Sequence, residues 1–191
     1  MTRIIAGLAK SVLLATPGGT QTRPTSDRVR EALFGSLDAR AAVLGARTLD
    51  LYAGTGALGL EALSRGAHQV TLVDQSAQAV SACRSNAQRV IRAAGLTPDT
   101  VRVVTSTAAT FLRTQPSSYD LAFLDPPYAL PGEELSSVLI TLLPQLAPDA
   151  VVAVERSRRS PSPAWPAGYT PLSTRHYGET SIYLATVGEE A

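Results

Sequence analysis

At 191 residues, of which 45% are hydrophobic and 17% charged, the chain has the length and composition of one globular domain with a sizeable core. This composition excludes a disordered tail, and a formal net charge of +1 excludes a strongly polybasic protein. The charge is uneven, since residues 1–47 hold seven basic and three acidic residues, a net +4 that leaves −3 for the rest. A basic first quarter suits a polyanionic partner, although scattered arginines are more commonly part of a solvated surface.

Few residues are available for redox or metal chemistry. Cys83 is the only cysteine, so neither an internal disulfide nor a thiolate metal cluster can form. His68 and His176 lie far apart without carboxylates at ligand spacing, so we expect no catalytic metal. No apolar run approaches the roughly 20 residues of a membrane span, and the first residues lack a long secretory core. We therefore expect a cytoplasmic protein that contacts no membrane.

The first 46 residues are expected to form an arm and an amphipathic helix. Residues 1–24 alternate short apolar runs with glycines, a pattern typical of a small β-hairpin. A helix follows, with Thr25 or Ser26 as its N-cap and Asp27 in its first turn. Near-helical spacing of apolar residues predicts one buried face. That face consists of Val29, Leu33, Phe34 and Leu37, whereas Arg28 and Arg30 are expected to project elsewhere.

Residues 47–188 are expected to form an α/β domain. Strands are predicted at 48–52, 69–74, 100–105, 120–125 and 150–155, with helices at 57–65, 77–94, 108–113 and 133–143. Repeated βα units predict a doubly wound, mostly parallel sheet with helices on both faces. After a proline-rich connection, residues 172–177 and 180–187 are expected to add an antiparallel hairpin, which makes seven strands.

A glycine-rich loop follows the first strand of this domain. Its string Gly-Thr-Gly-Ala-Leu-Gly lies between a strand and a helix, the context in which such a pattern is meaningful. Gly54 and Gly56 allow a tight turn beside a ligand, and Gly59 allows close helix packing. Asp74 ends the next strand, 20 residues beyond Gly54, where a carboxylate can accept hydrogen bonds from both ribose hydroxyls.

The glycine loop has two chemical interpretations besides a purely structural turn. In a dinucleotide dehydrogenase the glycines cradle a pyrophosphate. In a methyltransferase they pass the methionine part of S-adenosylmethionine, and Asp50 helps to hold its ammonium group.

A second motif, Asp125, Pro126, Pro127 and Tyr128, follows a buried strand. The prolines stiffen the turn and leave the Pro126 carbonyl free to accept hydrogen bonds. The Asp125 carboxylate is another acceptor, and Tyr128 offers a flat ring. Two acceptors and a ring suit a planar base with an exocyclic amino group. The alternative is ordinary loop punctuation, with Asp125 as a turn former.

The two motifs together favour a methyltransferase. Ligands of a doubly wound sheet bind at the carboxyl ends of its strands, so Gly54, Asp74 and Asp125 should face one crevice. A Pro-Pro-Tyr turn has no role in hydride transfer, but it has one beside a methyl donor. Carbon-5 methylation of cytosine needs a cysteine nucleophile, and Cys83, within a predicted helix, is expected to pack instead.

With these motifs the chain resembles the class I S-adenosylmethionine-dependent methyltransferases and, more narrowly, the RsmD family, which methylates N2 of a guanine in bacterial 16S ribosomal RNA. The resemblance covers nearly the whole chain and is carried by residues 3–7, 23–34, 50–67 and 125–128. The segment that begins Arg23-Pro24-Thr25-Ser26 is the most specific, because the other motifs also occur in adenine and cytosine methyltransferases. The resemblance implies a bacterial enzyme that acts on 16S ribosomal RNA and has a β-hairpin arm at its N-terminus. We expect a monomer whose substrate is the RNA within the small subunit or an assembly intermediate.

The resemblance and the strand-end argument together predict the site residues. Expected to bind the cofactor are Asp50, Tyr52, Ala53, Gly54, Thr55, Gly56, Asp74, Gln75, Ser106, Thr107, Ala108 and Asp125, and the catalytic residues are Asp125, Pro126, Pro127 and Tyr128. Expected to contact RNA are Lys10, Arg23, Thr25, Arg28 and Arg30, with an ion pair to a neighbouring carboxylate as the alternative for Arg30.

The chain departs from the family pattern at two places. Lys10 is the only positive charge in residues 8–11, where the family's arm is usually more basic, so arm contacts to RNA are expected to be weaker. Many relatives place an acidic or amide residue near the adenine, where this chain has Ser106, Thr107 and Ala108. Adenine recognition is therefore expected to use backbone groups and Thr107.

Three other functions remain as alternatives. A DNA base methyltransferase acting on adenine or cytosine is the nearest, although the chain has little spare length for a target-recognition domain. A nicotinamide-dependent oxidoreductase and a non-catalytic RNA-binding module are more distant.

Overall fold

The computed structural model describes residues 2–16, 27–114 and 117–188. At the N-terminus β1 (Thr2–Arg3) pairs antiparallel with β2 (Leu13–Leu14). The other strands are β3 (Arg47–Leu51), β4 (Gln69–Asp74), β5 (Val101–Thr105), β6 (Tyr119–Leu124), β7 (Leu146–Ser157), β8 (Tyr169–Tyr177) and β9 (Thr180–Val187). The helices are α1 (Asp27–Asp38), α2 (Ala57–Ser64), α3 (Ala77–Ala94), α4 (Ala108–Thr114) and α5 (Gly132–Leu142), with 3-10 turns η1 (Pro98–Thr100) and η2 (Leu143–Gln145).

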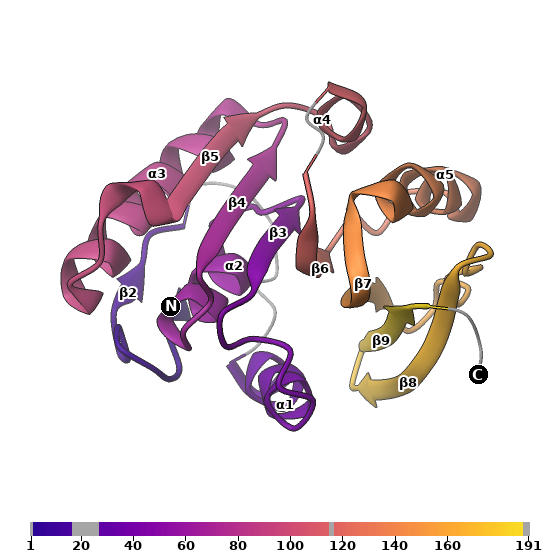
Figure 1. Cartoon of the computed structure of the whole chain (residues 1–191), viewed down its shortest axis with the longest axis horizontal. Coiled ribbons are helices and arrows are strands. Elements are labelled where there is room, and N and C mark those ends of the chain that lie inside the picture. The colour runs from indigo at the N-terminus through magenta and orange to yellow at the C-terminus, as the bar shows by residue number, and fades with distance from the viewer. Residues whose placement is uncertain (1, 17–26, 115–116, 189–191) are drawn as a thin grey trace.

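Strands β3 to β9 form one sheet in the order β5-β4-β3-β6-β7-β9-β8 (Figure 1). Neighbours from β5 through β7 are parallel, and β9 is antiparallel to both β7 and β8. The predicted fold, a doubly wound, mostly parallel seven-stranded sheet with a hairpin at the N-terminus, is confirmed. Because of these directions, the turn between β8 and β9 lies at the same edge as the carboxyl ends of β3, β4, β6 and β7.

Helices cover both faces of the sheet and bury two apolar clusters. One cluster joins α1, α2 and α3 to one face, and it includes Ile4, Ala9 and Leu14 of the N-terminal hairpin. The other joins α4 and α5 to the opposite face. In Figure 1, α4 and α5 lie across the sheet from α1 and α2. The arm thus shares a core with the sheet, and the division of the chain after residue 46 stays a prediction.

Helix α1 buries the apolar face that its spacing predicted, but it also buries an arginine. The Arg30 side chain has no exposed surface, and its Nη2 donates to the Arg3 carbonyl at 2.6 Å and to the Asp27 carboxylate at 2.8 Å. The expectation that Arg30 projects from the helix and contacts RNA is therefore wrong. The alternative, an ion pair with a neighbouring carboxylate, is correct. The N-cap positions Thr25 and Ser26 lie outside the described residues.

Two buried polar side chains of α2 hold the N-terminal hairpin. The carboxylate of Glu61 accepts the backbone N–H groups of Ile5 at 2.7 Å and Ala6 at 3.0 Å. The hydroxyl of Ser64 accepts the N–H of Ala9 at 2.9 Å and donates to the Ala6 carbonyl at 2.6 Å. Both side chains are almost fully buried; without the hairpin the Ser64 hydroxyl would lose both of these bonds, and Glu61 would lose both backbone donors and keep its ion pair with Arg65.

Replacing Gly7 by alanine should loosen the hairpin from α2. Gly7 has a φ of +82°, and a Cβ built there would lie 1.9 Å from the Ser64 carbonyl oxygen. Backbone strain and the clash together should lower the free energy of unfolding by about 2–4 kcal/mol, measured by urea denaturation. Gly45→Ala is the matched control, because Gly45 has a φ of +76° but open space around it. Equal losses in the two variants would contradict a close contact at Gly7.

Candidate active site

A cavity of about 890 Å³ lies at the carboxyl ends of β3, β4, β5 and β6. All the predicted catalytic residues line it, and so do all the predicted cofactor-binding residues except Gly56. The wall also includes residues that the sequence analysis did not select, notably Ser76 of the β4–α3 turn, Arg113 of α4 and Glu134 of α5. The predicted convergence of the glycine loop, Asp74 and Asp125 on one crevice is confirmed.

The glycine loop turns sharply from β3 into α2. Gly54 (φ 55°) and Gly56 (φ 79°) adopt the left-handed conformation that their lack of a Cβ allows, and Tyr52 (φ 66°) adopts it despite its side chain. A Cβ on Gly59 would lie 2.4 Å from Leu72 of β4, so this glycine permits close packing of α2 on the sheet. Gly54 lines the cavity, whereas Gly56 lies behind it and contributes only to the turn.

Asp74 connects the end of β4 to the glycine loop. One carboxylate oxygen accepts the Gly54 N–H at 2.9 Å, and the other accepts the Ser76 N–H at 2.8 Å. Each oxygen keeps a second lone pair that can face the cavity. Asp74 therefore fixes the loop and also offers two acceptors for a pair of hydroxyl groups.

Asp50 is a buried carboxyl beneath the glycine loop. It accepts the Gly59 N–H at 2.9 Å, and only 1% of its surface is exposed. Burial raises the pKa of Asp50 to about 7; the hydrogen bond from Gly59 opposes this, and the nearby charge of Asp74 adds to it. A ligand cation in the cavity would favour the ionised form of Asp50.

Asp125 lies at the end of β6, beside Glu155 at the end of β7. The register pairs Leu124 with Val154, so the two carboxyl groups follow at adjacent positions. Burial raises the pKa of Asp125 well above its usual value, and the charges of Glu155 and Asp50 raise it further. Like charges around an enclosed space suit a positively charged ligand.

The turn after Asp125 is held by hydrogen bonds from two sides. The Leu130 N–H donates to the Pro127 carbonyl at 2.9 Å, and Arg156 Nη2 donates to the Leu130 carbonyl at 2.8 Å. Arg156 is almost fully buried, and its charge lowers the pKa of Tyr52, which burial and Glu134 raise to about 12 overall. Arg156 thus holds the turn after Asp125 from inside the sheet. Tyr128, in contrast, keeps 52% of its surface exposed.

Cys83 and Thr107 stabilise the backbone around the cavity. Cys83 of α3 is fully buried, its Sγ donates to the Gly54 carbonyl at 3.1 Å, and burial raises the pKa of its thiol. A protonated, buried thiol suits the predicted packing role and no nucleophilic one. Thr107 caps α4, since its hydroxyl accepts the Thr110 N–H at 3.2 Å. In the described part of the chain, no three His, Cys, Asp or Glu residues group as metal ligands.

Of the predicted RNA contacts, Lys10, Arg28 and Arg30 do not line this cavity. Lys10 in the hairpin and Arg28 at the start of α1 are exposed, so both stay predictions. Arg23 and Thr25 fall outside the described residues. Across residues 2–16, 27–114 and 117–188, no helix combines the length and apolar character that crossing a membrane requires.

Known proteins share both this sequence and this arrangement. A family model described as "Conserved hypothetical protein 95" matches residues 2–186. The chain is 36% identical over 183 residues to "Ribosomal RNA small subunit methyltransferase D" of Escherichia coli K12, a match that covers 95% of this chain and 88% of that protein. The chain belongs to the RsmD family. The resemblance predicted from the motifs is therefore confirmed.

Solved structures agree with membership of the RsmD family. The structure of yhhF from Escherichia coli superposes with a TM-score of 0.81 at 33% identity, and the match covers 97% of each chain. TrmN from Thermus thermophilus, at 24% identity and a TM-score of 0.65, shares the fold over 83% of this chain and 48% of its own. The sheet is thus the class I methyltransferase fold.

Besides Ser76, Arg113 and Glu134 of the cavity wall, two residues beside the RsmD-type site were not predicted, namely Glu155 and Arg156. Both were assigned to the end of a strand or just beyond it, and no motif marked them. The sequence does hold one sign of them: an apolar strand that ends in adjacent Glu and Arg. Buried charges are usually paired, so this pattern could have indicated polar partners at the end of β7.

Replacing Asp50 by asparagine should flatten the pH dependence of stability. The Asp50 carboxyl keeps its proton up to about pH 7 when folded but only to about 3.8 when unfolded, so folding becomes less favourable as pH rises between these values. The asparagine side chain would still accept the Gly59 N–H but cannot ionise. Relative to wild type, the Asp50→Asn variant should gain up to about 1.4 kcal/mol for each pH unit between 5 and 7, measured by urea denaturation.

The control for this measurement is Asp149→Asn, which removes an exposed carboxyl at a position with a φ of 62°. Asparagine tolerates this conformation as aspartate does, so the substitution removes a surface carboxyl without adding backbone strain. A pH-independent difference for the Asp50 variant would contradict a raised pKa at Asp50.

Proposed function

We propose that this protein transfers the methyl group of S-adenosylmethionine to the exocyclic N2 amine of a guanine in 16S ribosomal RNA. The observation that carries the proposal is the opening of the Asp125–Tyr128 turn and the Asp74-bound glycine loop into one cavity. Membership of the RsmD family, whose relative in Escherichia coli is named as a small-subunit ribosomal RNA methyltransferase, supports this substrate. We further propose that the protein acts as a monomer in the cytoplasm.

The residues around the glycine loop fit S-adenosylmethionine. Asp74 offers its two free lone-pair positions to the ribose hydroxyls, while its hydrogen bond to Gly54 holds the loop beside the ligand. Asp50 lies below the loop, where the ammonium of the methionine part would favour its ionised form. Ser106, Thr107 and Ala108 line the wall expected to face the adenine.

The Asp125–Tyr128 turn aligns the amine of the base with the methyl group of the cofactor. Bound S-adenosylmethionine supplies a methyl group that is already electrophilic, so the protein must direct the amine lone pair toward it. Asp125 and the Pro126 carbonyl accept the two N–H bonds of the amine, and Tyr128 stacks on the base. As positive charge develops on nitrogen, the Asp125 carboxylate stabilises it. Glu155 beside Asp125 strengthens the negative potential at this point.

The RNA strand must present its guanine at this edge of the sheet. A base in a loop is unstacked at little cost, whereas a base in a duplex must be flipped out for a few kcal/mol. Lys10 of the hairpin and Arg28 of α1 are exposed cations that we propose for phosphate contacts. We propose that the small subunit, or an assembly intermediate of it, is the substrate.

Replacing Asp125 by alanine should lower methyl transfer by about 100-fold or more while S-adenosylmethionine still binds, because one acceptor of the amine is lost. The measurement is transfer of labelled methyl to 16S ribosomal RNA from cells that lack the gene. Asp120→Ala is the control, because Asp120 lies exposed in the same strand, five positions before the turn, and bonds the Arg47 N–H. Wild-type turnover by the Asp125 variant would rule out the amine clamp.

Methyl-transfer and binding measurements together separate the alternative functions. Transfer to duplex DNA in preference to ribosomal RNA would replace the proposal by a DNA base methyltransferase. Binding of NAD without binding of S-adenosylmethionine would replace it by an oxidoreductase. RNA binding without any transfer would leave only an RNA-binding module.

Replacing Asp74 by alanine should weaken S-adenosylmethionine binding first. Charge-assisted hydrogen bonds are worth about 1.5–3 kcal/mol each, so the loss should be about 10-fold or more, measured by calorimetry. At saturating cofactor the Asp74 variant should recover most of its turnover, which distinguishes it from the Asp125 variant. Unchanged cofactor affinity would show that Asp74 only fixes the glycine loop.

A further inference from the structure

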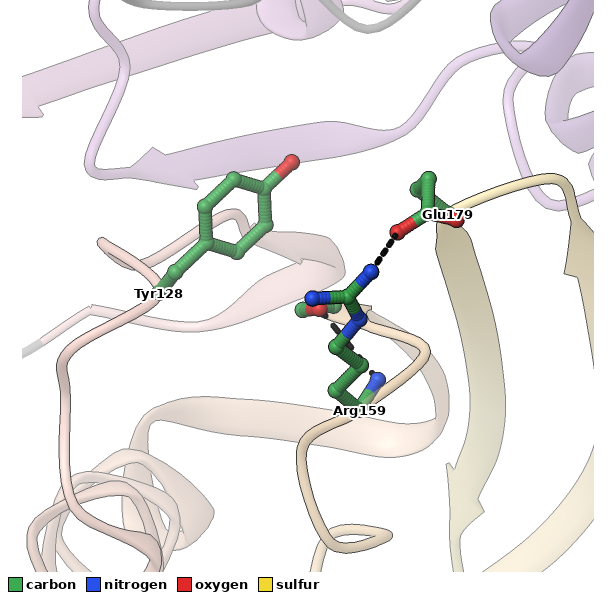
Figure 2. Close-up of a pocket in the computed structure, with 4 residues that line it drawn as sticks. Tyr128, Arg159 and Glu179 are labelled. Carbon is green, nitrogen blue, oxygen red and sulfur yellow. Dashed lines mark hydrogen bonds and ion pairs between the residues drawn. The ribbon is translucent and has the colours of Figure 1, made fainter.

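A second pocket, of about 530 Å³, adjoins the active site at Tyr128. It is lined by Tyr128, Ser157, Arg159 and Glu179, and we name it the strand subsite. Tyr128 also lines the larger cavity, so its ring stands between the two spaces. In Figure 2 the guanidinium of Arg159 lies between the Tyr128 ring and the Glu179 carboxylate.

The backbone around the strand subsite is well fixed. The Arg158 N–H donates to the Glu179 carbonyl at 2.8 Å, which joins the turn after β7 to the turn between β8 and β9. The Arg159 N–H donates to the Ser157 hydroxyl at 3.3 Å. The antiparallel hairpin thereby presents its turn at the edge of the sheet where the catalytic turn lies.

The charged side chains of the strand subsite are, in contrast, loosely held. Arg159 Nη2 and Glu179 Oε2 are 3.5 Å apart, and the two side chains are 86% and 63% exposed. Strong charge-assisted bonds measure about 2.7–2.9 Å, and exposed ion pairs contribute at most about 1 kcal/mol. An anion that enters the pocket can therefore draw Arg159 from Glu179 at little cost.

We propose that the strand subsite binds the sugar and phosphate of an RNA nucleotide next to the methylated one, and that Arg159 leaves Glu179 to contact its phosphate. This inference rests on the proposed function, because it needs the target base in the adjoining cavity. The volume lies within the roughly 300–1,000 Å³ of ordinary ligand pockets. Proteins that bind single-stranded nucleic acid combine aromatic rings with cationic side chains, as Tyr128 and Arg159 are combined here. Glu179 acts as the competitor that phosphate must displace.

Arg159 and Glu179 should therefore have opposite effects on RNA binding. The probe is 16S ribosomal RNA, naked or in small subunits from cells that lack the gene, whichever the wild type methylates. Arg159→Gln should raise the dissociation constant about 5-fold and reduce the slope of log K against log salt by about 0.7–1. Glu179→Gln should lower the dissociation constant about 2- to 5-fold, because Arg159 is released and a repulsive charge is lost.

Arg92→Gln is the matched control. Arg92 is exposed in α3, which packs against β5 at the opposite edge of the sheet from β8, and its loss changes the net charge equally. Its salt slope should equal that of the wild type, and S-adenosylmethionine affinity should be unchanged in all three variants. Both features distinguish a local phosphate contact from general loss of charge or misfolding.

The outcomes separate the two proposals. If the wild type neither binds nor methylates the RNA, the proposed function and the strand subsite both fail. If the wild type methylates RNA but Arg159→Gln keeps its slope and affinity, only the subsite fails. If the variants change affinity for small subunits but not for naked RNA that is itself methylated, the pocket contacts a ribosomal protein, and the RNA contact is overturned.

Discussion

The structure depends on the parallel direction of β3, β4, β6 and β7, because this direction brings four acidic side chains to one edge of the sheet. Asp50, Asp74, Asp125 and Glu155 each lie at or near the carboxyl end of a strand. Burial raises the pKa values of Asp50 and Asp125, and the charges of neighbouring carboxyls in this group raise them further. Such a site is costly to ionise when empty and suits a cationic ligand, and S-adenosylmethionine carries both a sulfonium and an ammonium.

The same edge combines rigid and loose parts. Asp74 holds the glycine loop through Gly54, and Arg156 holds the turn after Asp125 through the Leu130 carbonyl, so this side of the cavity is already formed. Tyr128 and Arg159 are exposed at the same end of the sheet, where we propose that the RNA strand binds. A preformed cofactor site next to an adaptable strand surface fits a reaction in which a small ligand is constant and a large substrate must be positioned.

The N-terminal arm is connected to the site through its hydrogen bonds to α2. Glu61 and Ser64 bond the hairpin from the helix that begins at the glycine loop, so the arm and the cofactor loop share one support. Arg30 of α1 also holds the hairpin, because its guanidinium donates hydrogen bonds to the Arg3 carbonyl and the Asp27 carboxylate. Its charge, which the sequence suggested for RNA, instead holds α1 to the hairpin.

The sequence by itself determined the order of strands and helices, the hairpins at both ends, the glycine loop and the Asp125–Tyr128 turn, because periodicity, prolines and glycines act within a few residues of themselves. It also predicted that strand ends would converge, since parallel strands impose this. Only the tertiary structure decided that Glu155 adjoins Asp125, that Arg30 is buried, and that Arg159 and Glu179 flank Tyr128. Each of these contacts depends on register or packing between segments far apart in the chain, about which local patterns carry no information.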